Sequence, residues 1–239
     1  MNILIVHAHP EPQSFCSAMK DLAVTTLEAA GHQVQLSDLY AMNWNPVAAD
    51  SDFASRSDPD YLVYALEQRH AHNQQSLAAD IQAELDKLLW ADLLILNFPL
   101  YWCSVPAMLK GWIDRVLVSG ACYGGLRFYD RGGLAGKRAM LSFTLGAQPH
   151  MFADEQAIHG ELDLMLRPLQ RGTLAYTGCT VLPPFAAYHV PYLDDAARQA
   201  ILDDYRHHLL QLEQLTPLRF PRLAEFDKRL QPLSGEVSA

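Results

Sequence analysis

The chain has 239 residues, of which 50% are hydrophobic, and a formal net charge of -9. This length and composition are sufficient for one well-packed core and exclude an intrinsically disordered chain. An acidic chain without a basic cluster is a poor candidate for binding nucleic acid or an anionic membrane surface. The longest apolar run, residues 93–105, is interrupted by polar residues and proline. We therefore expect no direct membrane insertion.

The N-terminus has no basic region before its first apolar run, which predicts a strand and not a signal peptide. Four cysteines, Cys16, Cys103, Cys122 and Cys179, lie far apart and form no CxxC pair. This usage argues against a disulfide framework and predicts a reducing, cytoplasmic compartment. Several histidine pairs are present, but no Cys or carboxylate stands at a diagnostic spacing from them, so we expect no metal site.

The first part of the chain alternates between strand and helix patterns. Residues 3–7 form a continuous apolar run, which is typical of a strand buried on both faces. Apolar residues at helical spacing from 15 to 26 predict a helix that Gly31 ends. Residues 33–36 alternate and predict a second strand. The long excursion over residues 38–79 has helical character at 60–70, and its length indicates a binding elaboration.

The same alternation continues to the C-terminus. It predicts helices at residues 81–89, from Pro106 to 117, at 161–169 and at 195–215, and strands at 93–98, 138–144 and 175–182. Residues 216–239 contain three prolines and have weak periodicity. We therefore expect one domain over residues 1–215, followed by an extended C-terminal arm over residues 216–239.

Alternating buried strands and helices predict an α/β fold, with a doubly wound, five-stranded parallel sheet and helices on both faces. Five strands favour the flavodoxin-like order 2-1-3-4-5. Ligands of such sheets bind outside the carboxyl ends of the strands, at the switch point between strands 1 and 3. The expected site therefore lies in the loops that follow residues 6, 98 and 143.

Each of these three loops allows a binding and a purely structural interpretation. The first has neither GxGxxG nor a P-loop, but it enters a helix near Ser14, whose N-terminus could hold a phosphate or simply be capped by the serine. The second places Tyr101 and Trp102 between two prolines, either as a flat wall for a planar ring or as core residues. The third, residues 144–149, has small residues that allow close backbone approach or form an ordinary turn.

Taken together, the loops make the chain resemble the NAD(P)H:quinone oxidoreductase (DT-diaphorase) family over residues 1 to about 215. The matching segments are Ala8-His9, Ser14-Phe15 and Ala18-Met19-Lys20; Ser37-Asp38-Leu39-Tyr40-Ala41-Met42-Asn43-Trp44-Asn45-Pro46; Phe98-Pro99-Leu100-Tyr101-Trp102; Val105-Pro106-Ala107-Met108-Leu109-Lys110-Gly111-Trp112; and Ile158-His159-Gly160. Leu182-Pro183-Pro184-Phe185 is also similar to the bacterial branch that includes the ancillary oxidoreductase of a potassium efflux system.

The resemblance implies a homodimer that binds FAD, with FMN the less favoured cofactor, at the dimer interface. NADH or NADPH would reduce the flavin through N5, and a quinone or similar acceptor would then take both electrons in a ping-pong cycle. Residues 144–147 would donate backbone N–H groups to the flavin. The implied cofactor-binding residues are His9, Ser14, Phe15, Cys16, Ala18, Leu100, Tyr101, Trp102, Cys103, Thr144, Leu145, Gly146, Ala147 and Arg198.

The resemblance also implies a charge relay and a substrate pocket. His159 matches the relay histidine, while the relay tyrosine aligns with Phe152, which cannot donate a proton. His159 would then act alone or with water or Gln148, unless it only satisfies local carbonyls at a helix start. The implied substrate-binding residues are Trp102, Tyr123, Gly125, Phe128 and His159, of which Tyr123, Gly125 and Phe128 would come from the second subunit.

Two departures from the family pattern concern the same pocket. Val63 stands where the family has a glutamine that contacts FAD, and Gly125 stands where a second tyrosine would cover the substrate. We expect a more open pocket. Two alternatives to the enzyme remain: a flavin-binding ancillary or regulatory subunit of a membrane transporter, and an electron-transfer flavodoxin. The region around Trp102 and the long excursion argue against the flavodoxin.

Overall fold

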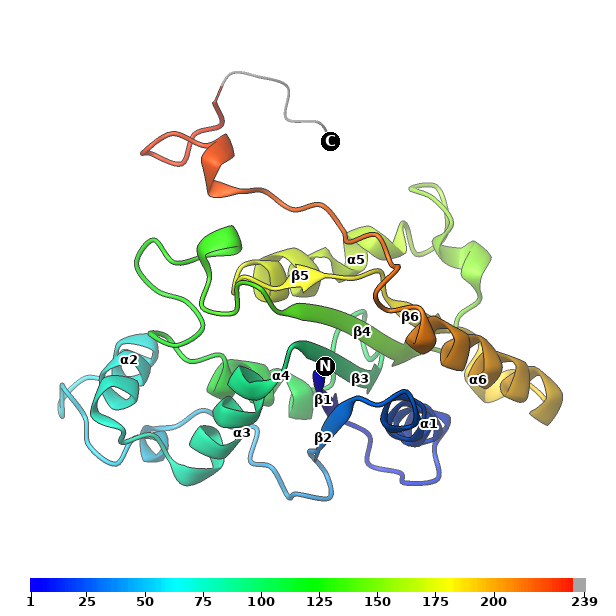
Figure 1. Cartoon of the computed structure of the whole chain (residues 1–239), viewed down its shortest axis with the longest axis horizontal. Coiled ribbons are helices and arrows are strands. Elements are labelled where there is room, and N and C mark those ends of the chain that lie inside the picture. The colour runs from blue at the N-terminus through cyan, green and yellow to red at the C-terminus, as the bar shows by residue number, and fades with distance from the viewer. Residues whose placement is uncertain (234–239) are drawn as a thin grey trace.

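The computed structural model describes residues 1–233 and has one parallel sheet between two layers of helices (Figure 1). The strands are β1 (Asn2–His7), β2 (Gln33–Asp38), β3 (Leu93–Pro99), β4 (Arg138–Thr144), β5 (Thr180–Val181) and β6 (Phe185–Ala187). The α-helices are α1 (Phe15–Ala29), α2 (Tyr64–Gln74), α3 (Ala79–Trp90), α4 (Ala107–Val116), α5 (Leu162–Leu169) and α6 (Asp195–Leu210).

The sheet has the order β2-β1-β3-β4-β5, and all of its pairings are parallel. This confirms the predicted doubly wound, flavodoxin-like arrangement. The central strands are buried on both faces, as their continuous apolar sequences require. From β1 the chain adds β2 on one side and then β3 on the other side, so the order of strand addition reverses between β1 and β3. The loops after these two strands therefore lie at the switch point of the sheet.

The prediction of one continuous strand over residues 175–182 is wrong. A π-helical turn, Gln170–Ala175, extends α5 into this region, and β5 is only two residues long. Pro183 and Pro184 then interrupt the pairing because proline has no N–H to donate. The chain returns to the sheet as β6, which pairs with β4 beyond β5. The fifth sheet position is therefore filled by two short strands in succession.

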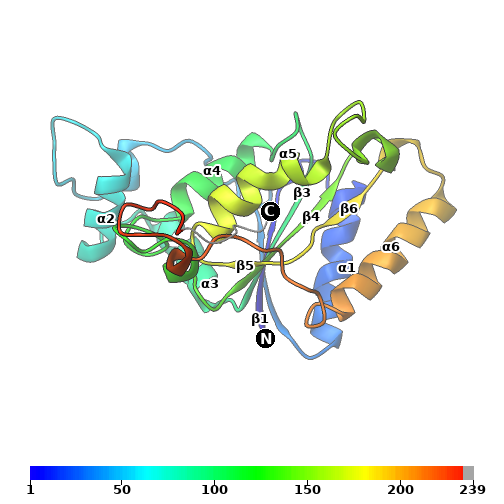
Figure 2. The same ribbon diagram turned by 90° about the horizontal axis from the view of Figure 1, so that it is seen from above.

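Figure 2 shows α1 and α6 on one face of the sheet and α3, α4 and α5 on the other. The alternation of side chains along β1 produces two cores, because successive residues of a strand point to opposite faces. Ile3 and Ile5 pack with α1 and α6, whereas Leu4 and Val6 pack with the opposite helical layer. Both cores are buried, and they fix the carboxyl ends of the strands that carry the site.

The excursion over residues 38–79 is anchored to α4 by a buried ion pair. The guanidinium of Arg115 lies 2.7 Å from Asp52 and donates to the carbonyl of Asn45 at 2.9 Å. It also stacks over the ring of Trp44, 4.6 Å from the ring centroid. The helix in this excursion, α2, begins at residue 64, four residues after the predicted start. The excursion has no separate hydrophobic core, and it is therefore held against α4 both by this ion pair and by packing.

The C-terminal part also differs from the prediction, since α6 ends at Leu210 and not at residue 215. The arm then runs along the outer edge of the sheet, where the amide of Leu218 donates to the carbonyl of Val181 at 2.9 Å (Figure 1). The arm is described as far as residue 233, and residues 234–239 lie outside the described part. Within residues 1–233, no helix is long and apolar enough to cross a membrane.

Candidate functional site

The three predicted loops meet at the carboxyl ends of β1, β3 and β4. They enclose an open cavity of about 250 Å³. Its lining combines the start of α1, the turn after β3, the end of β4 and the segment after β6. The residues are His9, Ser14, Phe15, Cys16, Pro99, Leu100, Tyr101, Thr144, Leu145, Gly146, Val190 and Pro191. The structure therefore brings together nine of the fourteen residues that the sequence implied for the cofactor.

One end of the cavity is the N-terminus of α1. Ser14 is the N-cap, and its hydroxyl accepts a hydrogen bond from the amide of Ser17 at 3.1 Å. The preceding amides, of Phe15 and Cys16, have no carbonyl partner in the first turn of the helix. Two free amides at the positive end of a helix dipole form a suitable site for a phosphate.

His9 adds a donor beside this helix start. Its Nδ1 accepts a hydrogen bond from the amide of Glu11 at 3.0 Å, which leaves the ring proton on Nε2. Burial lowers the pKa of His9, so the ring is neutral near pH 7. Burial also raises the pKa of the Cys16 thiol to about 12, which excludes a thiolate at this position. The pyrophosphate of a dinucleotide would thus meet neutral donors only.

The turn after β3 is strained. Tyr101 and Ser104 exchange two backbone hydrogen bonds of 3.0 Å, and between them Trp102 and Cys103 have φ values of 49° and 60°. Positive φ at both central residues defines a type I′ turn, which normally takes Asn-Gly. Trp102 is 99% exposed, so no packing in the chain explains its presence there. A strained, fully exposed tryptophan at a sheet switch point indicates a ligand-binding surface.

The loop after β4 has two free amides, those of Gly146, which lines the same cavity, and of Ala147, the next residue along. Neither Gly146 nor Ala147 donates its amide to any residue in the described part of the chain. The implied donation from Leu145 is wrong, because its amide is bonded to the carbonyl of Ala187 at 3.0 Å. His189 contacts the loop through its imidazole, whose Nδ1 lies 3.1 Å from the Gly146 carbonyl. Gly146 and Ala147 can therefore bind a carbonyl or an anionic ring edge.

Phe152 and His159 lie on the same loop and contact one another. Their ring centroids are 5.0 Å apart, and the amide of His159 donates to the carbonyl of Met151 at 3.0 Å. Phe152 is buried, whereas His159 is exposed and its imidazole makes no hydrogen bond within residues 1–233. The interpretation of His159 as a residue that satisfies local carbonyls therefore has no contact to support it.

Comparison with known proteins agrees with this geometry. A family model described as flavodoxin-like fold matches residues 1–209. The chain is 40% identical to rat NAD(P)H dehydrogenase [quinone] 1 over 229 residues, which is 95% of this chain and 83% of the relative. It is 41% identical to human ribosyldihydronicotinamide dehydrogenase [quinone] over 217 residues, covering 90% of this chain and 94% of the relative.

A crystal structure from Klebsiella pneumoniae, of a protein assigned as a quinone reductase, superposes with a TM-score of 0.91 at 36% identity. The match covers 97% of this chain and 93% of that one. The chain belongs to the flavodoxin-like NAD(P)H:quinone oxidoreductase family. Membership confirms the resemblance on which the expected site residues depend.

Three of the residues that the family resemblance implies for substrate binding do not lie at the cavity of their own chain. Tyr123 lines a separate cavity beside α4, and Phe128 stacks on Tyr176 with ring centroids 5.7 Å apart. Gly125 lies in the connecting turn with φ of 63° and is exposed. All three residues follow α4, away from the loops of the candidate site.

Five residues implied for the cofactor do not line the cavity. They are Ala18, Trp102, Cys103, Ala147 and Arg198. Arg198 donates to the carbonyl of Val190 at 3.4 Å, so it lies behind the wall that Val190 and Pro191 form. This wall lies beyond the strand predicted at 175–182, because the chain returns to the sheet as β6. The Pro183-Pro184 pair was the signal that the strand breaks and resumes further along.

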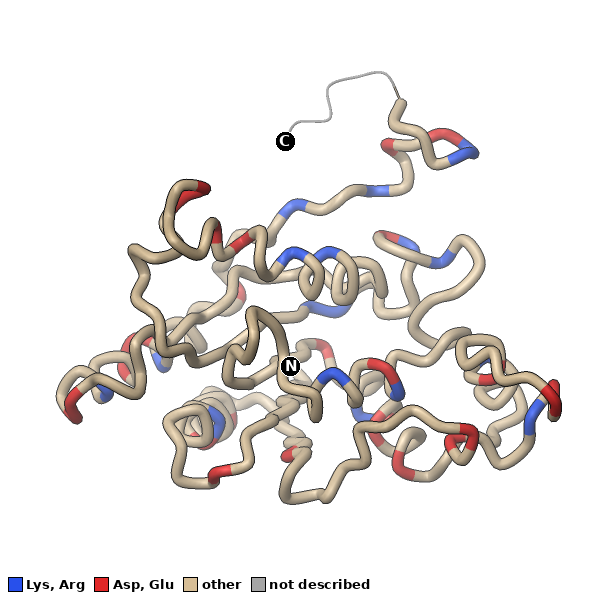
Figure 3. The backbone as a smooth tube through the Cα atoms, turned by 180° about the vertical axis from the view of Figure 1, so that it is seen from behind, with Lys and Arg blue, Asp and Glu red and all other residues tan. Residues whose placement is uncertain are grey.

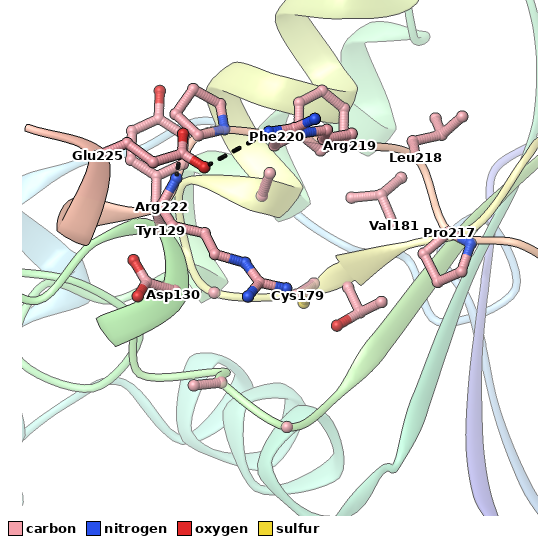
Figure 4. Close-up of a pocket in the computed structure, with 16 residues that line it drawn as sticks. Tyr129, Asp130, Cys179, Val181, Pro217, Leu218, Arg219, Phe220, Arg222 and Glu225 are labelled. Carbon is pink, nitrogen blue, oxygen red and sulfur yellow. Dashed lines mark hydrogen bonds and ion pairs between the residues drawn. The ribbon is translucent and has the colours of Figure 1, made fainter. Parts of the chain in front are cut away.

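A larger cavity, of about 590 Å³, lies at the opposite end of the sheet (Figure 4). It is bounded by the turns that precede β4 and β5 and by the arm. The arm is fixed there by hydrogen bonds from the amide of Leu223 to Asp130 at 2.8 Å and from the amide of Leu218 to the carbonyl of Val181 at 2.9 Å, and an ion pair between Arg219 and Glu225 lies within the arm itself. The arm therefore covers the amino ends of the strands and not the candidate site.

Acidic and basic residues are interspersed along the backbone in Figure 3. Among residues 1–233, no group of three His, Cys, Asp or Glu side chains is placed to hold a metal ion.

Proposed function

We propose that this chain is an FAD-dependent NAD(P)H:quinone oxidoreductase that works as a homodimer in the cytoplasm. The observation that carries the proposal is the exposed Trp102 turn, which lies at the same sheet edge as two pairs of free backbone amides. A flavin requires this combination: a flat apolar wall for its ring, donors at the ring edge and donors for its phosphates. No feature of residues 1–233 favours the transporter-subunit alternative.

The residues present fit a flavin. The amides of Phe15 and Cys16, with Nε2 of His9, would hold the phosphates at the start of α1. Tyr101 and Trp102 would cover one face of the ring, and the 144–147 loop would contact its pyrimidine edge. When bound, the flavin would supply the redox chemistry, two-electron transfer from NAD(P)H to a quinone in ping-pong order at one site.

The chain's own contribution to the reaction is orientation and charge stabilisation. Donors that are already aimed at the ring edge stabilise negative charge without reorganising during the reaction. The amides of Gly146 and Ala147 are fixed in this way by β6 and His189. His159, the one exposed imidazole against Phe152, would supply the proton or positive charge that the phenylalanine cannot.

The substrate face of the site would be completed by a second copy of the chain. Tyr123 and Phe128 of the partner subunit would approach the flavin from above, with Gly125 leaving space between them. In a single chain these residues lie away from the cavity, which is compatible with their use across an interface. Sedimentation should then give twice the chain mass of 26.7 kDa.

The proposal is tested by reconstituting the purified protein with FAD or FMN and measuring NAD(P)H oxidation by a benzoquinone. We expect tight FAD binding, and double-reciprocal plots that stay parallel as the quinone concentration varies. Stronger activity with FMN would contradict the cofactor assignment. Intersecting lines would contradict the ping-pong order. An absence of quinone reduction with either flavin would overturn the function.

A further inference from the structure

A buried polar cluster lies directly beneath the start of α1. It consists of His7 at the end of β1, Asn97 at the end of β3 and Ser17 in the first turn of α1, each at most 1% exposed. His7 and Asn97 are register partners on adjacent strands. Burying three polar side chains between apolar strands costs free energy unless each is hydrogen-bonded, so their arrangement requires a reason.

The cluster forms a continuous chain of hydrogen bonds. Nδ1 of His7 lies 2.6 Å from Oδ1 of Asn97, and Nε2 of His7 lies 3.2 Å from the hydroxyl of Ser17. Ser17 accepts from the hydroxyl of Ser14 at 2.9 Å and donates to the carbonyl of Glu11 at 2.9 Å. The chain therefore runs from the end of β3, through the imidazole, to the N-cap of α1.

The hydrogen bond to Asn97 selects the tautomer of His7. Because Oδ1 of Asn97 can only accept, the ring proton of His7 is on Nδ1, and the single hydroxyl proton of Ser17 is shared between Nε2 of His7 and the carbonyl of Glu11. Burial lowers the pKa of His7, which keeps the ring neutral. The hydroxyl of Ser14 is turned inward to Ser17, so it does not enter the cavity.

The hydrogen-bond chain determines which backbone amides at the start of α1 are left without a partner. With Ser14 fixed as the cap of the Ser17 amide, the first turn of α1 presents the amides of Phe15 and Cys16 to the cavity in one orientation. We propose that His7 is a positioning residue for the phosphate end of the flavin, acting through Ser17 to preorganise these two amides. The inference rests on the proposed flavin site, which it deepens by assigning the residue that orients its anion-binding end.

The test compares FAD with riboflavin, which carries the same ring and no phosphate. We expect His7→Leu to weaken FAD binding by at least about 10-fold, as loss of a supporting hydrogen bond typically does, with riboflavin affinity within about twofold. Equal loss of both affinities would show a merely structural role and overturn the proposal, as would no loss of either. If the wild-type chain binds neither flavin, the proposed function itself fails.

Two further variants keep the test decisive. Ser17→Ala breaks the same chain without altering the central strand, so it should reproduce the selective loss of FAD affinity even where His7→Leu fails to fold. His7→Gln can donate to Asn97 and accept from Ser17, so it should restore part of that affinity. His208→Leu, a matched change at a half-buried histidine on α6, should leave the ratio of the two affinities unchanged. A shifted ratio in His208→Leu would contradict the assignment to His7.

Discussion

Trp102 illustrates how one residue can be unfavourable for the fold and informative about function. Left-handed backbone at a bulky residue costs about 1 to 3 kcal/mol. Its side chain recovers none of this by packing, because it is 99% exposed. A ligand that covers the indole would offset the cost, and Tyr101, the first residue of the same turn, lines the cavity. The same reasoning applies less strongly to Cys103, which is smaller.

We therefore expect Trp102→Asn to raise the free energy of unfolding of the flavin-free protein by about 1 kcal/mol, because asparagine tolerates this backbone conformation. The same change should weaken flavin binding at least about 10-fold, since an aromatic wall contributes on the order of 1 kcal/mol or more. Urea denaturation and flavin fluorescence measure the two effects. Gln75→Asn, at a left-handed position far from the site, should give only the stability gain.

His159 is the second residue with a specific expectation. Its replacement by alanine should lower the rate of flavin reduction by at least about 10-fold, because its exposed imidazole, packed against Phe152, is the group proposed to supply the proton or positive charge. Stopped-flow absorbance at the flavin band measures this rate directly. His150→Ala, an exposed histidine on the preceding turn, serves as the control and should change the rate less than twofold. Equal effects of both variants would refute the relay.

At the scale of elements, the Asp52–Arg115 pair is one of the contacts that hold the excursion in place. Burial by itself would raise the pKa of Asp52, but hydrogen bonds from Arg115 and Tyr64 outweigh it and hold the pKa below its usual range. The carboxylate therefore contributes stability above the pKa of the unfolded chain, about 4. That contribution is lost as pH falls through the lower pKa of the folded state.

Replacing Arg115 by methionine should lower the free energy of unfolding by about 3 to 5 kcal/mol, because Asp52 is left buried without its cation. The loss should shrink as the pH is lowered, since protonation removes the unpaired charge. Denaturant titrations at several pH values measure both effects. Lys110→Met, which breaks an exposed pair with Asp114, should cost less than about 1 kcal/mol. A similar cost for the two variants would contradict the account.

The elements also show what the sequence could predict. Buried strands such as β1 and β3 were found because their apolar runs require burial on both faces. The late start of β5 was missed because residues 175–182 are apolar enough for a strand, whereas the helical turn over 170–175 continues into this region. The end of α6 was missed for a related reason: the apolar pattern continues beyond Leu210, whereas the helix does not.

For the molecule as a whole, sheet topology located the site before any side chain was considered. The switch-point rule identified the three loops, and the structure gathers nine implied cofactor residues around one cavity there. The polar cluster beneath α1 could not be predicted, because it depends on contacts between residues far apart in the sequence, whereas the wall after β6 had a local signal in Pro183-Pro184. Sequence patterns specify where backbones run more reliably than which polar groups meet.

The central claim is that a flavin lies against the Trp102 turn with its phosphates at the start of α1. The most direct measurement is to release and identify the flavin bound to the purified protein, and to titrate the same sample with NAD(P)H without oxygen. We predict FAD at one per chain, bleached completely by one equivalent of NAD(P)H. A protein that carries no flavin and takes up none when FAD is added would contradict the account.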